Sequence, residues 1–214
     1  GDTIWVERAR ARVNQGRPLE FLRTAIHSRR QFNIHTAQQL TVFGAPGSTG
    51  SELLNDGMLI GDVEALSLSG SGSITGNMTI PAEKKGMPPQ SLYDEYLARA
   101  TTLTFSGNLQ DIVLGPGINE YDGSGANPDG VYYINTGGSN LDIQTMRLYG
   151  TLIVDVGAGT LNVYNVSMEP CREDFPVLIV KGNMYQNTDG GLLDESWENH
   201  NYNPVGAPYH GETD

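Results

Sequence analysis

The chain has 214 residues, a net charge of −12, 27 glycines, 11 prolines and one cysteine. This length allows a substantial core, and 38% hydrophobic residues exclude a chain that is disordered by composition. The single cysteine excludes an intramolecular disulfide and a cysteine-based zinc site, and no apolar run is long enough to form a membrane-spanning helix.

The charge is unevenly distributed. Residues 1–35 carry a net charge of +4, and the remainder carries −16. Because an acidic body repels phosphate backbones, we do not expect nucleic acid as a partner. The chain begins without a methionine or a signal sequence, which indicates a mature or trimmed protein.

Residues 1–31 are predicted to form an N-terminal segment with a strand followed by a helix. Apolar residues alternate from Ile4. Pro18 suits a first helical position, and Leu19, Leu22 and Ile26 follow at helical spacing, which predicts a helix over 18–30.

Residues 32–185 are predicted to form one domain of short strands. Between Met58 and Ile80, apolar pairs alternate with glycine and a small polar residue, so the strands are too short for an ordinary sandwich. Further on, apolar runs begin at 131, 141, 152 and 161, which leaves no room for helices between strands and excludes a doubly wound α/β sheet.

A repeated motif marks the corners between these strands. Glycine followed by Asn or Asp and an apolar residue lets the backbone turn and begin another strand. This pattern predicts a mostly β solenoid whose turns share one core, with a β-sandwich as the alternative. The motif occurs at Gly61-Asp62-Val63, Gly76-Asn77-Met78, Gly107-Asn108-Leu109 and Gly182-Asn183-Met184.

Two further segments flank this pattern. Pro88-Pro89 precedes a capping box from Ser91 to Asp94, and apolar residues at helical spacing predict a side helix near 91–100. Residues 186–214 are predicted to form an acidic tail or a strap across the last turn, with Trp197 and Tyr202 as apolar anchors.

The stretch Ile60–Ile80 resembles the repeat of bactofilins, which are polymer-forming β-solenoid proteins. The order of elements over about residues 20–185 resembles bacterial envelope proteins of the PilX-like pilus-assembly group. It comprises corner-rich strands, the Pro-Pro helix at 88–100, the segment 128–134 and a hydrophobic run before Pro176-Val-Leu-Ile-Val-Lys-Gly-Asn183. This resemblance implies a right-handed parallel β-helix with one or two short helices, preceded by a membrane anchor. It implies no catalytic residues, and we expect membrane contact only through an anchor that the sequence here lacks.

Two groups of acidic and amide residues could carry chemistry. In the glycine-rich stretch 115–130, five side chains could converge on a calcium ion, although their spacing differs from an EF-hand: Asn119, Glu120, Asp122, Asn127 and Asp129. Asp142 and Asp155 lie in β-runs and could form the carboxylate pair of a glycoside hydrolase. Five tyrosines could stack on sugars: Tyr121, Tyr132, Tyr133, Tyr149 and Tyr164.

These patterns predict a non-enzymatic structural or adhesive module of a bacterial cell-envelope, pilus-associated or extracellular protein. Its expected partners are other envelope or pilus proteins, or surface glycans, and no cofactor other than calcium is expected. Two alternatives stay open. One is a carbohydrate-binding or carbohydrate-active β-helix protein that uses Asp142 and Asp155, and the other is a self-polymerising bactofilin-like scaffold.

Overall fold

The computed structural model describes the backbone of residues 3–6 and the ranges 25–36, 39–42, 45–85, 87–172, 175–187, 193–209 and 211. Of the described residues, 49% lie in strands and 8% in helices, which confirms the predicted mostly β class. Within these ranges, no helix has the length and apolar character needed to cross a membrane.

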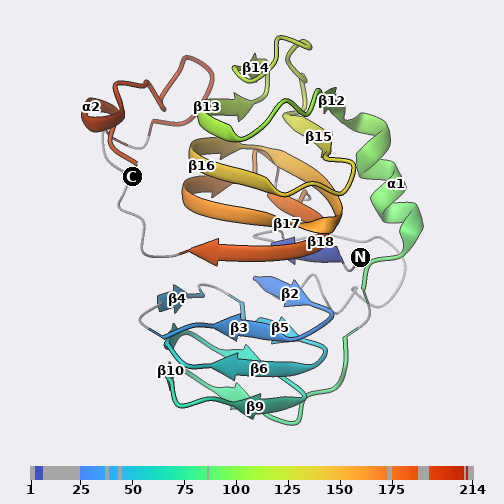
Figure 1. The fold of residues 1–214 in the computed structure, drawn as a ribbon, viewed down its shortest axis with the longest axis vertical. Helices are drawn as coiled ribbons and strands as arrows, with labels where there is room; N and C mark the ends of the chain where they lie inside the picture. The colour runs from blue at the N-terminus through green and yellow to red at the C-terminus, as the bar shows by residue number, and fades with distance from the viewer. Residues whose placement is uncertain are drawn as a thin grey trace.

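The N-terminal part of the fold consists of short strands (Figure 1). Apart from β1, they form three parallel ladders, β2–β5–β8–β11, β3–β6–β9 and β4–β7–β10, which we call the N-terminal stack. The bounds are β1 Thr3–Val6, β2 Ile26–Ser28, β3 Phe32–Ile34, β4 Gln39–Thr41, β5 Gly47–Thr49, β6 Glu52–Asn55, β7 Met58–Ile60, β8 Val63–Glu64, β9 Ser67–Ser69, β10 Ser73–Thr75 and β11 Met78–Thr79.

The register of the N-terminal stack shows how the chain winds. In its first turn the paired residues Ile26 and Gly47 are 21 positions apart. In its last turn Leu53 pairs with Leu68 and Val63 with Met78, so each paired residue lies beside the one 15 positions later. Within those 15 residues the chain passes through one strand of each ladder. Each turn therefore hydrogen-bonds to the next through all three ladders.

The predicted glycine corners occur where this winding requires them. Asn77 stacks on Asp62, because its backbone N–H donates to Oδ1 of Asp62 at 2.8 Å. At Gly61, a Cβ atom would lie 2.4 Å from the carbonyl oxygen of Val42 in the preceding turn, so no side chain fits. All four predicted corner glycines have the left-handed backbone: Gly61 (φ 123°), Gly76 (146°), Gly107 (132°) and Gly182 (137°).

The C-terminal part contains longer strands and two helices. Strands β13, β16, β17 and β18 form one parallel ladder, and β12, β15, β17 and β18 form another, which together we call the C-terminal stack. The bounds are α1 Gln90–Arg99, β12 Thr101–Leu103, β13 Leu109–Gly115, β14 Ile118–Asn119, β15 Val131–Asn135, β16 Leu141–Tyr149, β17 Thr151–Glu169, β18 Leu178–Asn187 and α2 Glu195–Glu198.

The described pairings of the C-terminal stack span 20 or more residues. Val131 pairs with Thr151 and Leu141 with Leu161, 20 residues apart, whereas Leu109 and Ile143 are 34 residues apart. Strand β17 belongs to both ladders because it bends at Gly157 (φ 54°), where its register with β18 also shifts.

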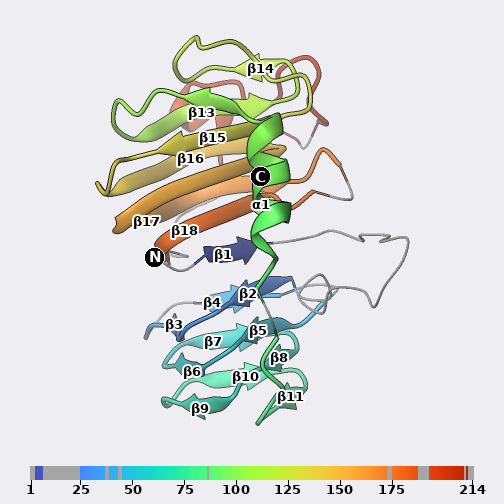
Figure 2. The same ribbon diagram turned by 90° about the vertical axis from the view of Figure 1, so that its right-hand side faces the viewer.

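Strand β1 joins the two stacks. It pairs antiparallel with β18 on one side and with β2 on the other, so one sheet continues through the whole molecule (Figures 1 and 2). The apolar interior has a large cluster in the C-terminal stack, around Leu141 and Leu161, and a smaller one around Leu53 and Leu59.

The connector from β11 to β12 runs back along the outside of the stacks and carries α1 (Figure 2). Tyr96 of this helix packs with Ile153 and Ile179, which point outward from β17 and β18, and its ring meets Phe175 edge-on with ring centroids 4.9 Å apart. The predicted side helix is therefore present, and it covers an apolar outer face.

Two local predictions are wrong. The predicted helix over 18–30 is a strand at Ile26–Ser28, where Ile26 pairs with Gly47, and residues 18–24 lie outside the described ranges. Ladder pairing outweighs a local helical pattern here. The predicted capping box is also wrong, because Pro89 occupies the N-cap position of α1 and no side chain makes a capping hydrogen bond.

Substituting Gly61 by alanine tests the close stacking of corners. The new Cβ would clash with the Val42 carbonyl in addition to disfavouring the backbone conformation, so we expect a loss of about 3 kcal/mol in unfolding free energy. Gly107→Ala is the matched control, because its backbone is equally left-handed (φ 132°) and its Cβ would meet nothing within 4 Å. Chemical denaturation measures both variants, and equal losses would contradict the stacking explanation.

Candidate functional site

The structure places the two aspartates of the predicted hydrolase pair in different ladders. Asp155 precedes the bend of β17 and accepts a hydrogen bond from Lys181 Nζ at 2.9 Å. Asp142 pairs in register with Asn162, which follows the bend, and the amide of Asn162 donates to Asp142 Oδ1 at 2.6 Å. Each carboxylate therefore binds a residue of the next turn, and the bend separates the two.

The predicted calcium loop folds over the first turn of the C-terminal stack. Tyr121 and Phe105 pack against the apolar interior there. The hydroxyl of Tyr121 accepts a hydrogen bond from the backbone N–H of Ser106 and donates to the carbonyl of Gly107, at 3.1 and 3.3 Å. We call residues 116–127 the upper cap, since they cover this end of the interior.

Asn119 and Asp122 hold the upper cap in shape. The amide of Asn119 donates to Oδ1 of Asp122 at 3.0 Å, and the backbone N–H of Thr104 donates to Oδ2 at 2.6 Å. Burial favours the neutral acid, yet hydrogen bonds from Ser124, Thr104 and Asn119 outweigh it and hold the pKa of Asp122 well below its usual value. The carboxylate thus stays charged and joins two parts of the chain.

The other calcium candidates make separate contacts. Asn127 donates to the carbonyl of Arg99 at 2.8 Å, and its side-chain oxygen accepts from the backbone N–H of Asp129 at 2.8 Å. Glu120 accepts from the backbone N–H of Val113 at 2.7 Å and lies 3.1 Å from His200 Nε2. In the described ranges, no group of three or more His, Cys, Asp or Glu residues could hold a metal ion. Calcium binding stays a prediction.

Residues 193–209 and 211, which we call the C-terminal strap, cross the outer face of the C-terminal stack. Leu193 and Tyr202 are buried against Val113 of β13. The hydroxyl of Tyr202 donates to the carbonyl of Thr145 at 3.0 Å, and burial together with the nearby carboxylates raises the pKa of this tyrosine. Tyr202 is the predicted anchor, whereas the prediction for Trp197 is wrong, because that side chain is 85% exposed.

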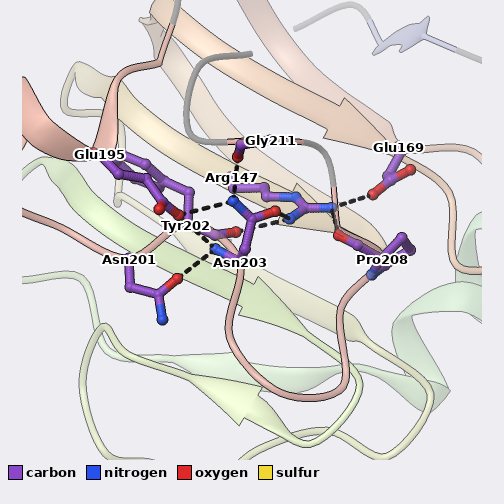
Figure 3. Close-up of polar contacts among 8 residues, drawn as sticks. All are labelled: Arg147, Glu169, Glu195, Asn201, Tyr202, Asn203, Pro208 and Gly211. Atoms are coloured by element: carbon purple, nitrogen blue, oxygen red, sulfur yellow. Dashed lines mark hydrogen bonds and ion pairs between the residues drawn. The ribbon is translucent and has the colours of Figure 1, made fainter.

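Arg147 of β16 anchors the strap (Figure 3). Its guanidinium is 1% exposed and donates to the carbonyls of Tyr202 and Pro208 at 2.8 and 2.6 Å. It also donates to Oδ1 of Asn203 at 3.0 Å and to Oε1 of Glu169 at 2.7 Å. One buried cation therefore joins the stack to two points of the strap.

Asn203 extends this network within the strap (Figure 3). Its amide donates to Glu195 at 2.8 Å and to the carbonyl of Gly211, while its backbone N–H donates to Oδ1 of Asn201 at 2.8 Å. Sequence reasoning missed this network, because a single arginine at an outward strand position looks like any exposed charge.

A second feature missed from the sequence is a column of strained residues on the same face. Asp111, Thr145 and Asn165 have φ of 52°, 44° and 46°, and the strand registers place them side by side in successive turns. Left-handed backbone is uncommon outside glycine, most of all for a β-branched residue such as threonine. Thr145 Oγ1 donates to Asp111 Oδ1 at 2.5 Å, so hydrogen bonding between turns supports the conformation.

His27 of β2 is also a buried polar residue. It is 1% exposed, and neither ring nitrogen has a hydrogen-bond partner of normal geometry among the described residues. Burial, assisted by the charge of Lys85, lowers the pKa of His27 to about 4, although Glu64 acts in the opposite direction. The imidazole is therefore neutral at pH 7.

Three of the five predicted sugar-stacking tyrosines make structural contacts. Tyr132 is fully buried, and its hydroxyl lies within hydrogen-bonding distance of the carbonyl oxygens of Gly115 and Ile118, at 2.8 and 2.6 Å. Tyr121 belongs to the upper cap, and Tyr133 packs beside α1. At these three positions the ring stabilises the fold.

Replacing Arg147 by methionine tests the anchor of the strap. Because the substitution leaves Glu169 and two carbonyls without their buried donor, we expect a loss of about 3–5 kcal/mol and faster amide hydrogen exchange in residues 193–209. Lys181→Met removes an exposed ion pair with Asp155 and should cost less than about 1 kcal/mol. Unchanged exchange in the strap of the Arg147 variant would contradict this role.

The burial of His27 predicts a pH dependence of stability. Between its unfolded pKa of 6.5 and its folded pKa of about 4, the unfolded chain binds the extra proton. The contribution of the neutral His27 to the unfolding free energy is therefore fully present above pH 6.5, and it falls by up to about 3 kcal/mol as the pH drops to 4. Denaturation of His27→Gln should lack this component, whereas the same substitution at exposed His35 should retain it. Parallel pH profiles for the wild type and His27→Gln would refute the prediction.

Comparison of the chain with protein-family models, with curated proteins and with solved structures gives no match.

Proposed function

We propose that the chain forms a right-handed parallel β-helix and serves as a non-enzymatic structural or adhesive module of a bacterial cell-envelope, pilus-associated or extracellular protein. The observation that carries this proposal is the parallel register between successive turns, as between Val63 and Met78 or between Leu141 and Leu161. A β-sandwich is built from antiparallel sheets, so it does not account for these parallel ladders.

Such a stack suits a structural role for a physical reason. Each turn contacts only its neighbours, so the length of the body is set by the number of turns and the backbone ladders resist its extension. Three polar residues also support a structural role, because they hold parts of the chain together. Arg147 fastens the strap, Asp122 the upper cap and Asp155 the neighbouring turn.

The envelope location rests on two resemblances. Ile60–Ile80 resembles the bactofilin repeat, and the order of elements over residues 20–185 resembles the PilX-like pilus-assembly group. The acidic surface, with a net charge of −12, keeps the module soluble and directs it toward partners other than nucleic acid. The partners in this proposal are other envelope or pilus proteins.

One observation favours surface glycans as second partners. Trp197 and Tyr209 of the C-terminal strap are 85% and 74% exposed, and exposed aromatic rings stack on the apolar faces of sugars. An adhesive role would therefore place glycan contacts on the strap.

Cell fractionation tests the location. An antibody against the chain should detect it in the envelope fraction or in the medium of the cells that produce it. Detection in the cytoplasm alone would contradict the proposal.

Incubation with bacterial surface polysaccharides tests the absence of catalysis. We expect no release of reducing ends by the wild type or by a double variant with Asp142→Asn and Asp155→Asn, because each carboxylate is bound to a residue of the next turn. If glycans are bound, Trp197→Ala should reduce co-sedimentation with them. Cleavage that the double variant abolishes would replace the structural role with the hydrolase alternative.

A further inference from the structure

The last turn of the N-terminal stack, residues 66–80, leaves its interior uncovered. Leu68 and Met78 pair in register with Leu53 and Val63, which are 0% and 2% exposed. Their side chains therefore point to the same interior column, yet they are 42% and 55% exposed. The apolar column is thus exposed to solvent at this turn. We call residues 66–80 the lower end.

The opposite end shows what a covered column looks like. In the first turn of the C-terminal stack, Leu103, Leu109 and Leu114 are 2%, 0% and 0% exposed, because the upper cap and Phe105 lie over them. The same chain therefore buries the interior of one terminal turn and exposes that of the other. End turns of stacked folds need a polar cover to remain soluble alone.

The lower end also has open strand edges. Strands β9, β10 and β11 are each the last strand of their ladder, so their outer backbone groups face away from the stack (Figures 1 and 2). Proteins protect such edges with charged residues, especially lysine. Residues 65–82 contain no charged residue, although the chain as a whole carries −12.

We propose that the lower end is an interface for a second copy of this chain, which stacks end to end about a two-fold axis. This inference deepens the proposed structural role and rests on it. Two acidic bodies repel each other wherever their charged faces meet, whereas an uncharged end can meet its own copy without repulsion. The interface would bury Leu68 and Met78 of both copies.

The strand directions are compatible with this arrangement. A two-fold axis perpendicular to the stack brings the edge strands of the two copies together in antiparallel orientation. Strand β1 provides an example within the chain, since it pairs antiparallel with the parallel ladders on both of its sides, through β18 and β2. An antiparallel strand can therefore continue a ladder of this stack.

Assembly stops at two copies. The upper end is closed by the upper cap, and the strap covers a side face of the C-terminal stack, so neither offers a second open column. One turn of about 15 residues presents less area than the roughly 800 Å² per partner of a standard interface. We therefore expect a dimer that exchanges with monomer at micromolar concentrations, and no filament.

Sedimentation equilibrium of the full chain from micromolar to millimolar concentration tests the proposal. The wild type should shift from the 23.2 kDa monomer toward twice that mass. Small-angle X-ray scattering should show that the dimer is extended along the stack axis. Met78→Lys places like charges across the interface and should raise the dissociation constant at least about tenfold.

Two further variants make the result decisive. Val205→Lys introduces the same charge on the strap at a fully exposed side chain, and it should dimerise as the wild type does. If circular dichroism shows that Met78→Lys disturbs the fold, Leu66→Lys takes its place as the test of the interface, because Leu66 belongs to the same end and is 53% exposed. A monomer at all concentrations, a filament, or a dimer unaffected by the two lower-end variants would overturn the inference. Envelope location without polysaccharide cleavage would leave the structural role standing in that case.

Discussion

Hydrogen bonding of each turn to the next is the interaction on which the rest of this structure depends. No strand that the structure describes in the N-terminal stack exceeds four residues, and such strands are stable only because parallel neighbours lie beside them. The same stacking aligns the apolar side chains into columns, so Leu53 is buried by the turns beside it. It also forces the backbones together at corners such as Gly61, where no side chain fits.

A stack has two ends and outward faces, and they differ in whether other parts of the chain cover them. The upper cap closes one end through Tyr121 and Asp122, and the strap covers a side face through Tyr202 and the buried Arg147. Burying a guanidinium is costly unless its donors are used, and four acceptors satisfy two of its nitrogens. The apolar lower end has no such cover, and this contrast carries the inference of a paired copy.

Local signals in the sequence were sufficient for some features and misleading for others. The corner glycines were predictable because a left-handed backbone favours glycine wherever it occurs, as Gly76 and Gly182 show. The helix predicted over 18–30 failed at Ile26, because a residue paired on both sides in a sheet follows its neighbours rather than its own helical spacing. Calcium binding by the acidic loop stays a prediction, and contacts distant in sequence, such as Asp122 with Thr104, show its oxygens fastening a cap.

By itself, the sequence determined that this protein is mostly β, that glycine-marked corners interrupt its short strands, and that a helix lies beside them. These features depend on neighbouring residues, so they can be read along the chain. Only the tertiary structure decided that Arg147 is buried, that Thr145 adopts a strained backbone and that Met78 lies at an open end. Each of these depends on which turn lies beside which, and that arrangement is set by contacts between residues far apart in the chain.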